Sequence, residues 1–530
     1  MRRFYPKQLV TFLVAAFSAA PLLASAAPFK PGNIVVARVG NGSTALSAAA
    51  AEVFLDEYTP SGTLVQSIAL PTAVGVNNRI LTAAGSATSE LSLTRSADGH
   101  YLVLAGYGAA PGTASVASSA ATDVTRVIGL IGADGSIDTS TSTGTAFDGA
   151  SIRGAATVNG TSFYSVGSDG GVQYQAFGSY TTTPLTTTAA DILSINAVGS
   201  NLYIATNNSP YVGLSQVATG LPTTAGQPIT VLPGFPGATM GASPNGFYLA
   251  DLTEAVPGVD VAYVADDRTS GGGGIQKWSL VGGSWVLNGT IAGSTSVAVR
   301  GLSGQASGTS VALAAASNTG LFFLTDNAGY NAAPSLASLP AAVATAGTRK
   351  AFRGTAFAPV AAAPTIASFT PTSGGEGTTV TITGTNLTGA TSVQIGTTVI
   401  TNYTVVSATS ITLVVPNITG NLTGQVTVVT PGGTATSTGS FSLVLAARPS
   451  QALPELSVYP NPATDYVQVE LPQATALTVS LRDLLGRQVL APVVLQAHQP
   501  LRLPASLAAG VYLLEIEQGT TKAVRRIEKK

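Results

Sequence analysis

Short turn signals of the Asx-Gly type recur through the first 250 residues of this chain, most of them flanked by β-branched or aromatic runs. Asn-Gly and Asp-Gly favour the tight turns of β-hairpins because their backbones accept positive φ. Helical periodicity is nearly absent from the same region. The pattern predicts an all-β architecture built from hairpins. The signals are Asp98-Gly99, Asp134-Gly135, Asn159-Gly160, Asp169-Gly170 and Asn245-Gly246.

Similar segments follow one another across residues 27–358. They begin roughly 40 to 60 residues apart with about four short strands each, which is typical of the blades of a β-propeller. The last segment, TRKAFRGTAFAP, supplies one strand, and NIVVARVG, EVFLDEYTP and GTLVQSIAL at the start supply three. We therefore predict about six blades, with seven as the alternative, and one blade shared by both ends of the region. A large sandwich or a β-helix array is the competing interpretation.

Residues 364–444 alternate apolar and polar side chains at period two, as in Val380 and Ile382 or Val426 and Val428, and this predicts an Ig-like β-sandwich. The segment resembles an IPT/TIG domain at the turn 371–375, the bend 384–387 and the turn 431–433. Glu376 is its one charged residue. We expect a spacer, with direct glycan binding as the alternative.

Residues 455–530 also alternate at period two, for example at Val467, Val469 and Leu471, and predict a small β-sandwich. This tail resembles the C-terminal sorting domain of the Bacteroidetes type IX secretion system. The resemblance implies recognition by the outer-membrane translocon and a sortase, followed by release of the protein or its attachment to surface polysaccharide. The matching positions are Tyr459, Pro460, Asn461, Pro462, Asp465, Asp483, Gly486, Arg487, Gly510, Tyr512, Lys529 and Lys530.

Residues 1–26 have the pattern of a secretory signal peptide. Arg2, Arg3 and Lys7 precede a short apolar core at 9–17, and Ala24-Ser25-Ala26 has the small side chains of a cleavage site. The core is far shorter than the roughly 20 residues that span a bilayer, so we expect no transmembrane segment. The predicted location is secreted or attached to the outer-membrane surface, reached through the periplasm.

The composition limits the chemistry of the chain. It contains no cysteine, which excludes disulfides, thiolate nucleophiles and cysteine metal sites. Charged residues make up 9% of the sequence and the formal net charge is −1, so there is no basic surface to attract nucleic acid.

Four arginines fall in or just after the predicted innermost strands of the propeller: Arg95, Arg153, Arg300 and Arg353. Three of them stand in an Arg-Gly context. A ring of guanidinium groups at the channel mouth can hold a carboxylate or sulfate through bidentate hydrogen bonds. The alternative is that these arginines pair with carboxylates or backbone carbonyls inside the blades.

Other candidates carry weaker signals. Five acidic residues crowd one predicted blade and make calcium the one candidate cofactor, although solvated loop carboxylates are the preferred explanation. His100 is expected in a turn, and no catalytic residue is predicted. Trp278 and Trp285 flank a Gly-Gly turn and form either a sugar-stacking platform or a cross-strand pair. The acidic residues are Asp251, Glu254, Asp260, Asp266 and Asp267.

The sequence thus favours a secreted or surface-displayed binding or adhesion protein whose propeller presents a face to an extracellular polysaccharide or protein. An extracellular polysaccharide hydrolase or lyase using propeller carboxylates and a structural surface-layer component are the alternatives. An enzyme is expected to place at least two acidic side chains in one concave mouth. A binding protein is expected to show aromatic or arginine groups there instead.

Overall fold

The computed structural model describes residues 26–238, 241–269, 271–294, 297–417, 422–444, 453, 455–472, 474–519 and 521–530. In this part of the chain the only helix is the 3₁₀ turn η1 (Val116–Ser118), and no helix is long and apolar enough to cross a membrane. Residues 1–25 of the predicted signal peptide, and most of the predicted linker 446–454, lie outside the described residues. The boundary between the two compact units of the chain falls between Ala363 and Pro364.

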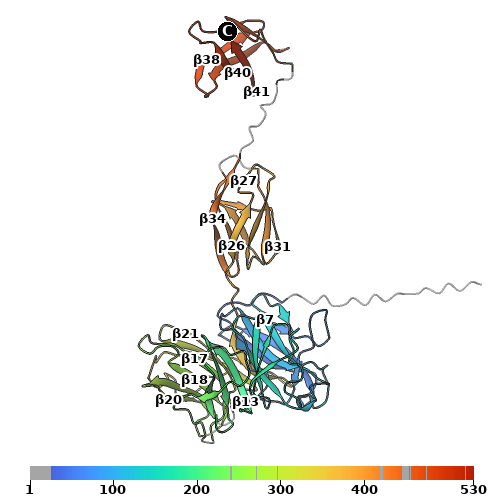
Figure 1. Ribbon diagram of the computed structural model, residues 1–530, viewed down its shortest axis with the longest axis vertical. Coiled ribbons are helices and arrows are strands. Elements are labelled where there is room, and N and C mark those ends of the chain that lie inside the picture. Colours follow the sequence, from blue (N-terminus) through green and yellow to red (C-terminus); the bar gives the residue numbers. More distant parts are fainter. Residues whose placement is uncertain are drawn as a thin grey trace, which may run out of the picture. The chain divides into compact units, whose positions relative to one another are not determined.

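The first unit is a six-bladed β-propeller, so the alternatives of seven blades, a sandwich or a β-helix are wrong. Each blade is four antiparallel strands, and strands of several blades are labelled in Figure 1. Blade 1 consists of β25 (Ala351–Phe357), β1 (Ile34–Val39), β2 (Ala50–Tyr58) and β3 (Leu64–Ala69); blade 2 of β5 (Thr94–Arg95), β6 (Tyr101–Tyr107), β7 (Arg126–Gly132) and β8 (Ile137–Asp138); blade 3 of β9 (Ile152–Ala156), β10 (Ser162–Gly167), β11 (Val172–Ala176) and β12 (Thr183–Thr186).

The remaining blades repeat the same order, with the innermost strand first in the chain. Blade 4 consists of β13 (Ile192–Val198), β14 (Asn201–Thr206), β15 (Gly213–Val217) and β16 (Ile229–Val231); blade 5 of β17 (Pro244–Ala250), β18 (Val261–Asp266), β19 (Gly274–Val281) and β20 (Ser284–Ala292); blade 6 of β21 (Gly301–Ser307), β22 (Ser310–Ala316), β23 (Gly320–Asp326) and β24 (Ala344–Thr345). The short strand β4 (Thr82–Ala84) pairs with both β2 and β6 and so joins blades 1 and 2.

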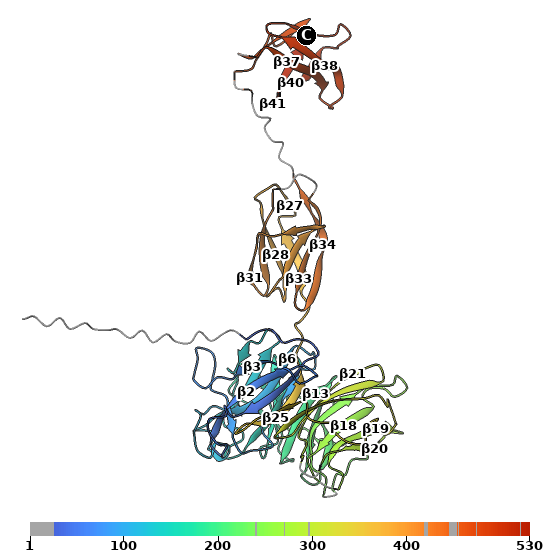
Figure 2. The ribbon, with the colours of Figure 1, turned by 180° about the vertical axis from the view of Figure 1, so that it is seen from behind.

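Blade 1 closes the ring. Strand β25 pairs antiparallel with β1, from Ile34 opposite Phe357 to Val39 opposite Ala351. In this sheet β1 lies between β25 and β2, and Figure 2 labels β25 next to the blue strands from the start of the chain. The prediction of one blade shared by both ends of the region is confirmed.

Four of the five predicted turn signals lie in hairpin turns, where Gly99, Gly135, Gly160 and Gly170 have φ between 79° and 82°. The prediction for Asn245-Gly246 is wrong, because both residues lie inside β17. A Cβ on Gly246 would lie 2.6 Å from the carbonyl oxygen of Arg300 in the neighbouring blade. The absence of a side chain at Gly246 therefore allows two neighbouring strands to approach closely, and it does not form a turn.

Residues 365–443 form the predicted Ig-like sandwich. Its core contains all the paired apolar positions of the alternating pattern, among them Val380, Ile411 and Phe441, which are fully buried. One sheet has the order β26 (Thr365–Thr370), β28 (Thr379–Thr385), β32 (Ser410–Val414) and β31 (Tyr403–Ser407); the other has β27 (Ser373–Gly374), β34 (Gly433–Leu443), β33 (Thr423–Thr430), β29 (Ser392–Ile395) and β30 (Thr398–Ile400).

The tail forms a second small β-structure with its own apolar core, which includes Val467, Leu514 and Ile527. A three-stranded sheet has the order β35 (Ser457–Tyr459), β36 (Tyr466–Glu470) and β39 (Leu501–Arg502); a four-stranded sheet has β38 (Gln488–Gln496), β37 (Ala476–Asp483), β40 (Gly510–Gln518) and β41 (Thr521–Lys529).

Candidate functional site

The innermost strands of the propeller surround a cavity of about 210 Å³, which we call the channel cavity. Residues of five of them line it: β5, β13, β17, β21 and β25, together with the segments that lead into them. The charged residues in this lining are Glu90, Arg95, Arg300 and Arg353, so arginines outnumber carboxylates three to one.

Glycines explain the repeated Arg-Gly sequence. Gly154, Gly301 and Gly354 lie at one level of the channel, where neighbouring inner strands nearly touch. Ser92 bridges to Gly154, and the Gly354 amide donates to the Leu91 carbonyl. A Cβ on Gly354 would lie 2.1 Å from the Leu93 nitrogen, and one on Gly301 would lie 2.5 Å from the Arg353 oxygen. Each of the three arginines therefore sits one residue before a glycine that strand packing requires.

Arg153 and Arg300 pair with carboxylates of loops at the end of the channel where the innermost strands begin. Arg153 Nη2 lies 2.5 Å from Oδ1 of Asp191, the residue before β13. Arg300 Nε donates to Oδ2 of Asp267, the residue after β18, at 2.9 Å. Both arginines therefore fasten a loop to the start of an inner strand.

Arg353 is buried, and its hydrogen-bond partners in the described part of the chain are all neutral. It donates to the carbonyls of Phe352 (2.9 Å) and Gly85 (3.0 Å) and to the side-chain oxygen of Asn318 (3.2 Å). Burial lowers the pKa of Arg353 to about 10, with the nearby charge of Glu90 acting in the opposite direction. The cation thus belongs to the channel lining without a carboxylate in contact.

Glu90 is the one acidic residue of the lining, and sequence reasoning did not single it out. Its carboxylate accepts hydrogen bonds from the Tyr107 hydroxyl at 2.6 Å and from the Ala84 amide at 3.0 Å. Burial raises the pKa of Glu90, while these hydrogen bonds and Arg353 oppose the rise. No local sequence signal marks this glutamate, because its partners come from β4, β6 and β25.

Arg95 does not join the other three. It lies three residues beyond Ser92 along the strand, or roughly 10 Å at the rise of an extended chain, towards the far end of the channel. Its Nε donates to the Gly99 carbonyl at 3.0 Å, and it forms no ion pair with any carboxylate in the described part of the chain. Burial lowers the pKa of Arg95, and the negative charge of Asp98 acts in the opposite direction. Tyr248 also lines the cavity.

The acidic residues of blade 5 do not converge on one site. Asp260 caps a turn by accepting the amides of Leu252 and Thr253, both at 2.8 Å. Asp266 accepts two hydrogen bonds from Arg268, at 2.7 and 2.8 Å. The described residues hold no group of three or more side chains suited to a metal ion, so calcium binding stays a prediction.

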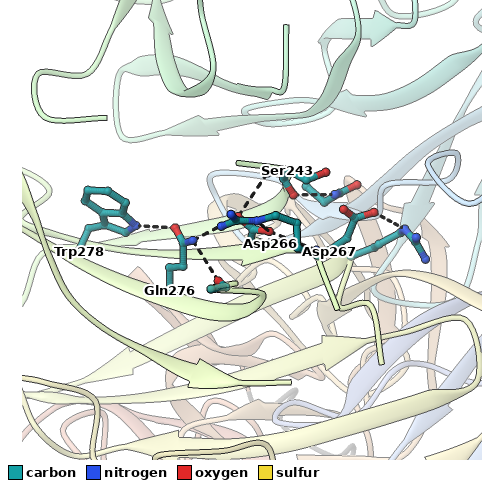
Figure 3. A network of polar contacts seen from close by, with 9 residues as sticks. Ser243, Asp266, Asp267, Gln276 and Trp278 are labelled. Atoms are coloured by element: carbon teal, nitrogen blue, oxygen red, sulfur yellow. Dashed lines mark hydrogen bonds and ion pairs between the residues drawn. The ribbon is translucent and has the colours of Figure 1, made fainter. Parts of the chain in front are cut away.

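A polar network runs from the blade interior to the channel (Figure 3). The Trp278 ring nitrogen donates to Gln276 at 3.1 Å, and Gln276 donates to Asp266 at 3.2 Å. The Ser243 amide donates to Asp266, and the Ser243 carbonyl accepts from the Asp267 amide, which brings the network to Arg300.

Both tryptophans are buried and therefore form no sugar-stacking platform. They pair with leucines in the hairpin, Trp278 opposite Leu287 and Trp285 opposite Leu280, rather than with each other. They meet instead on Phe235, whose ring stacks on Trp278 at 4.4 Å and lies 6.1 Å from Trp285. His100 lies in the turn between β5 and β6, as predicted, with its Nδ1 2.8 Å from the Val360 carbonyl.

Several matching positions of the tail hold its own strands together. The Asn461 side chain donates to the Arg526 carbonyl at 2.9 Å and accepts from the Glu528 amide at 2.8 Å, so it fixes β41. Lys529 Nζ donates to the Thr464 carbonyl at 2.9 Å, and the Tyr512 hydroxyl to the Ala508 carbonyl at 2.9 Å.

Comparison with protein-family models identifies two parts of the chain. Residues 457–530 match the secretion system C-terminal sorting domain, and residues 364–443 match the IPT/TIG domain. The resemblances inferred from the sequence are confirmed, and the chain carries the sorting tail of type IX secretion. Such a tail implies export to the cell surface or the medium. No curated protein matches the chain.

Solved structures give only distant likenesses. PorZ of Porphyromonas gingivalis, described as a surface component of the type-IX secretion system, is 13% identical with a TM-score of 0.26; the alignment covers 91% of this chain and 64% of PorZ. The GH74 enzyme of Niastella koreensis is 12% identical with a TM-score of 0.33, covering 84% and 72%. A surface glycan-binding protein of Prevotella bryantii is 13% identical with a TM-score of 0.19, covering 32% and 42%. At these values the likenesses say nothing about what this chain binds.

Proposed function

We propose that this exported protein binds an acidic extracellular polysaccharide, whose carboxylate or sulfate groups enter the channel cavity of the propeller. The sorting tail delivers the protein to the outside of the cell, and the IPT/TIG domain acts as a spacer. A protein ligand with an exposed carboxylate is the other class that the same chemistry accepts.

One observation carries this proposal: the channel cavity is lined by three arginines and a single carboxylate. Arg95 and Arg353 form no ion pair with a carboxylate among the described residues, although Arg353 is buried and Arg95 is half-buried. A cation held away from water without a counter-ion favours an incoming anion. A retaining or inverting glycosidase needs two carboxyl groups facing one another, and this lining offers only Glu90.

The test is a retention screen of the purified mature chain on immobilised polysaccharides, comparing pectate, alginate and chondroitin sulfate with neutral xylan and cellulose. We expect retention on the acidic polymers, weakened by salt. Arg95→Ala is expected to reduce affinity at least tenfold, since a charge-assisted contact contributes roughly 1.5–3 kcal/mol. Arg79→Ala removes an exposed arginine outside the cavity and is the matched control.

The same screen measures reducing ends and unsaturated products released into the medium. Release of sugar would replace the binding proposal with a hydrolase or lyase. Equal retention of the Arg95→Ala variant and the parent chain would move the binding site away from the channel cavity. Absence of retention on every polymer would favour a structural surface-layer role.

A further inference from the structure

The hairpin turn between β37 and β38 of the sorting tail exposes two neighbouring leucines. Leu484 is 67% and Leu485 is 81% exposed, the largest values among the large apolar side chains of the tail that the structure describes. Burying such side chains in a partner is favourable in proportion to the area removed from water. A rigid, exposed apolar pair in a protein that must pass through an aqueous periplasm calls for an explanation.

The turn is held in one shape by its own polar groups. The Asp483 side chain accepts the amides of Leu485 (3.0 Å) and Arg487 (2.9 Å), and it accepts Nε of Arg487 at 2.7 Å. The Gly486 amide donates to the Asp483 carbonyl at 3.0 Å, and the Asp483 amide to the Arg487 carbonyl at 2.9 Å. Arg482 adds a bond to the Gly486 carbonyl at 3.1 Å.

Gly486 has φ of 82°, a conformation that disfavours any side chain, although a Cβ there would meet nothing within 4 Å. The glycine is therefore needed for backbone conformation and not for space. Asp483, Gly486 and Arg487, three of the positions that match the sorting family, thus all act on the shape of the turn. The turn presents outward the two leucines between them and also the Arg487 side chain, which is 76% exposed but is paired with Asp483.

We propose that Leu484 and Leu485 are the contact by which a receptor protein of the secretion machinery recognises this tail, through an apolar pocket that takes both side chains. The inference rests on the sorting-domain match and is independent of the ligand proposed for the propeller. Recognition requires groups that a receptor can reach, and the neighbouring motif residues are occupied in holding the turn. Pre-organising the two leucines on a fixed turn lowers the entropy that binding must overcome.

The experiment uses the full chain produced in a bacterium with a working type IX system, with the protein measured outside the cells and in the periplasm. L484S/L485S is expected to lower the extracellular amount at least tenfold, with folded protein accumulating in the periplasm. L484M/L485M keeps an apolar pair and is expected to be exported normally. V74S/V76S changes two exposed valines of a propeller loop, 77% and 102% exposed, and is the matched control.

Normal export of L484S/L485S would overturn the proposal. If L484S/L485S is degraded, L484A/L485A replaces it, because alanine introduces no new polar group. The same loss of export is expected, and normal export of L484A/L485A would also overturn the proposal. Equal loss for V74S/V76S would show that export depends on exposed apolar surface in general and would also overturn the assignment. Removal of Asp483 by D483A is expected to reduce export even though both leucines remain, because the turn that presents them is released.

Discussion

The propeller and the Ig-like sandwich are both cysteine-free β-structures, yet the propeller buries charged side chains and the sandwich does not. The propeller buries a whole ion pair between two blades: Lys277 Nζ lies 2.8 Å from Asp326, with both side chains fully buried, and the Tyr263 hydroxyl donates to the same carboxylate at 2.6 Å. The sandwich holds one charged residue, the exposed Glu376. Its core is mainly apolar, and its buried polar side chains, Thr430 and Ser437, are uncharged.

The difference follows from what each fold must specify. Two sheets of one sandwich need only an apolar face each, which period-two alternation provides. Six similar blades must each meet the correct neighbour, and the Lys277–Asp326 pair joins blade 5 to blade 6. Arg126, fully buried in blade 2, similarly donates to the carbonyl of Ala150, the second residue before β9 of blade 3. We infer that the propeller depends on specific polar partners and the sandwich does not.

The largest expected effect comes from breaking the buried pair. Asp326→Ala leaves Lys277 as an uncompensated buried charge and is expected to cost about 3–5 kcal/mol of propeller stability. The chain has two tryptophans, Trp278 and Trp285, and both lie in blade 5, so urea unfolding followed by tryptophan fluorescence reports the propeller alone. The double variant K277M/D326L is expected to recover most of the lost stability. If Asp326→Ala is as stable as the parent chain, the propeller does not depend on this buried ion pair, and the proposed difference between the propeller and the sandwich is wrong.

Close strand contact at the channel gives the next effect. Gly354→Ala introduces a Cβ against the backbone of Leu91 and Leu93 and is expected to destabilise the propeller by about 1–3 kcal/mol. Gly439→Ala in strand β34 of the sandwich is the matched control, since its Cβ would meet only Phe369, at 3.9 Å. The same fluorescence assay measures the first variant, and hydrogen exchange of sandwich peptides measures the second. Equal losses of stability in the two variants would show that Gly354 has no special role in packing the inner strands of the propeller.

Acid is expected to weaken the propeller through Asp326. Burial acts to raise the pKa of this carboxyl, but hydrogen bonds from Lys277, Tyr263 and two amides outweigh it and hold the pKa at about 2. A folded pKa below the unfolded value of about 3.9 stabilises at neutral pH and loses that contribution as pH falls from about 4 to 2. The expected loss is about 2 kcal/mol. The urea midpoint of the parent chain should fall relative to that of K277M/D326L over this range, because the double variant lacks the titrating carboxyl; parallel curves would contradict the assignment.

The parts of this structure that were predictable are those set by local chemistry. Hairpin turns and period-two alternation depend on adjacent residues, so six blades, the shared blade and both smaller sandwiches could be predicted. Asn245-Gly246 could not be, because a glycine for a turn and a glycine for a close strand approach look alike in sequence. The four arginines share residue type and strand position, but the loops that bring Asp191 and Asp267 to two of them are set by tertiary structure. Glu90 has partners from three separate strands and no local signal at all.

The smallest expected effect tests the sandwich side of the comparison. Glu376→Gln removes the one charge of residues 364–444, and because Glu376 is exposed we expect a change within about 0.5 kcal/mol. Hydrogen exchange of peptides from β28 and β32 in the full chain, at pH 7 and pH 3, gives the stability of this domain separately from the propeller. Protection that is the same at both pH values, after correction for intrinsic exchange, would mean that no titrating group supports the sandwich. A pH-dependent loss that disappears in Glu376→Gln would show that this single carboxylate stabilises the domain, and the two folds would then differ only in the number of charges on which they depend.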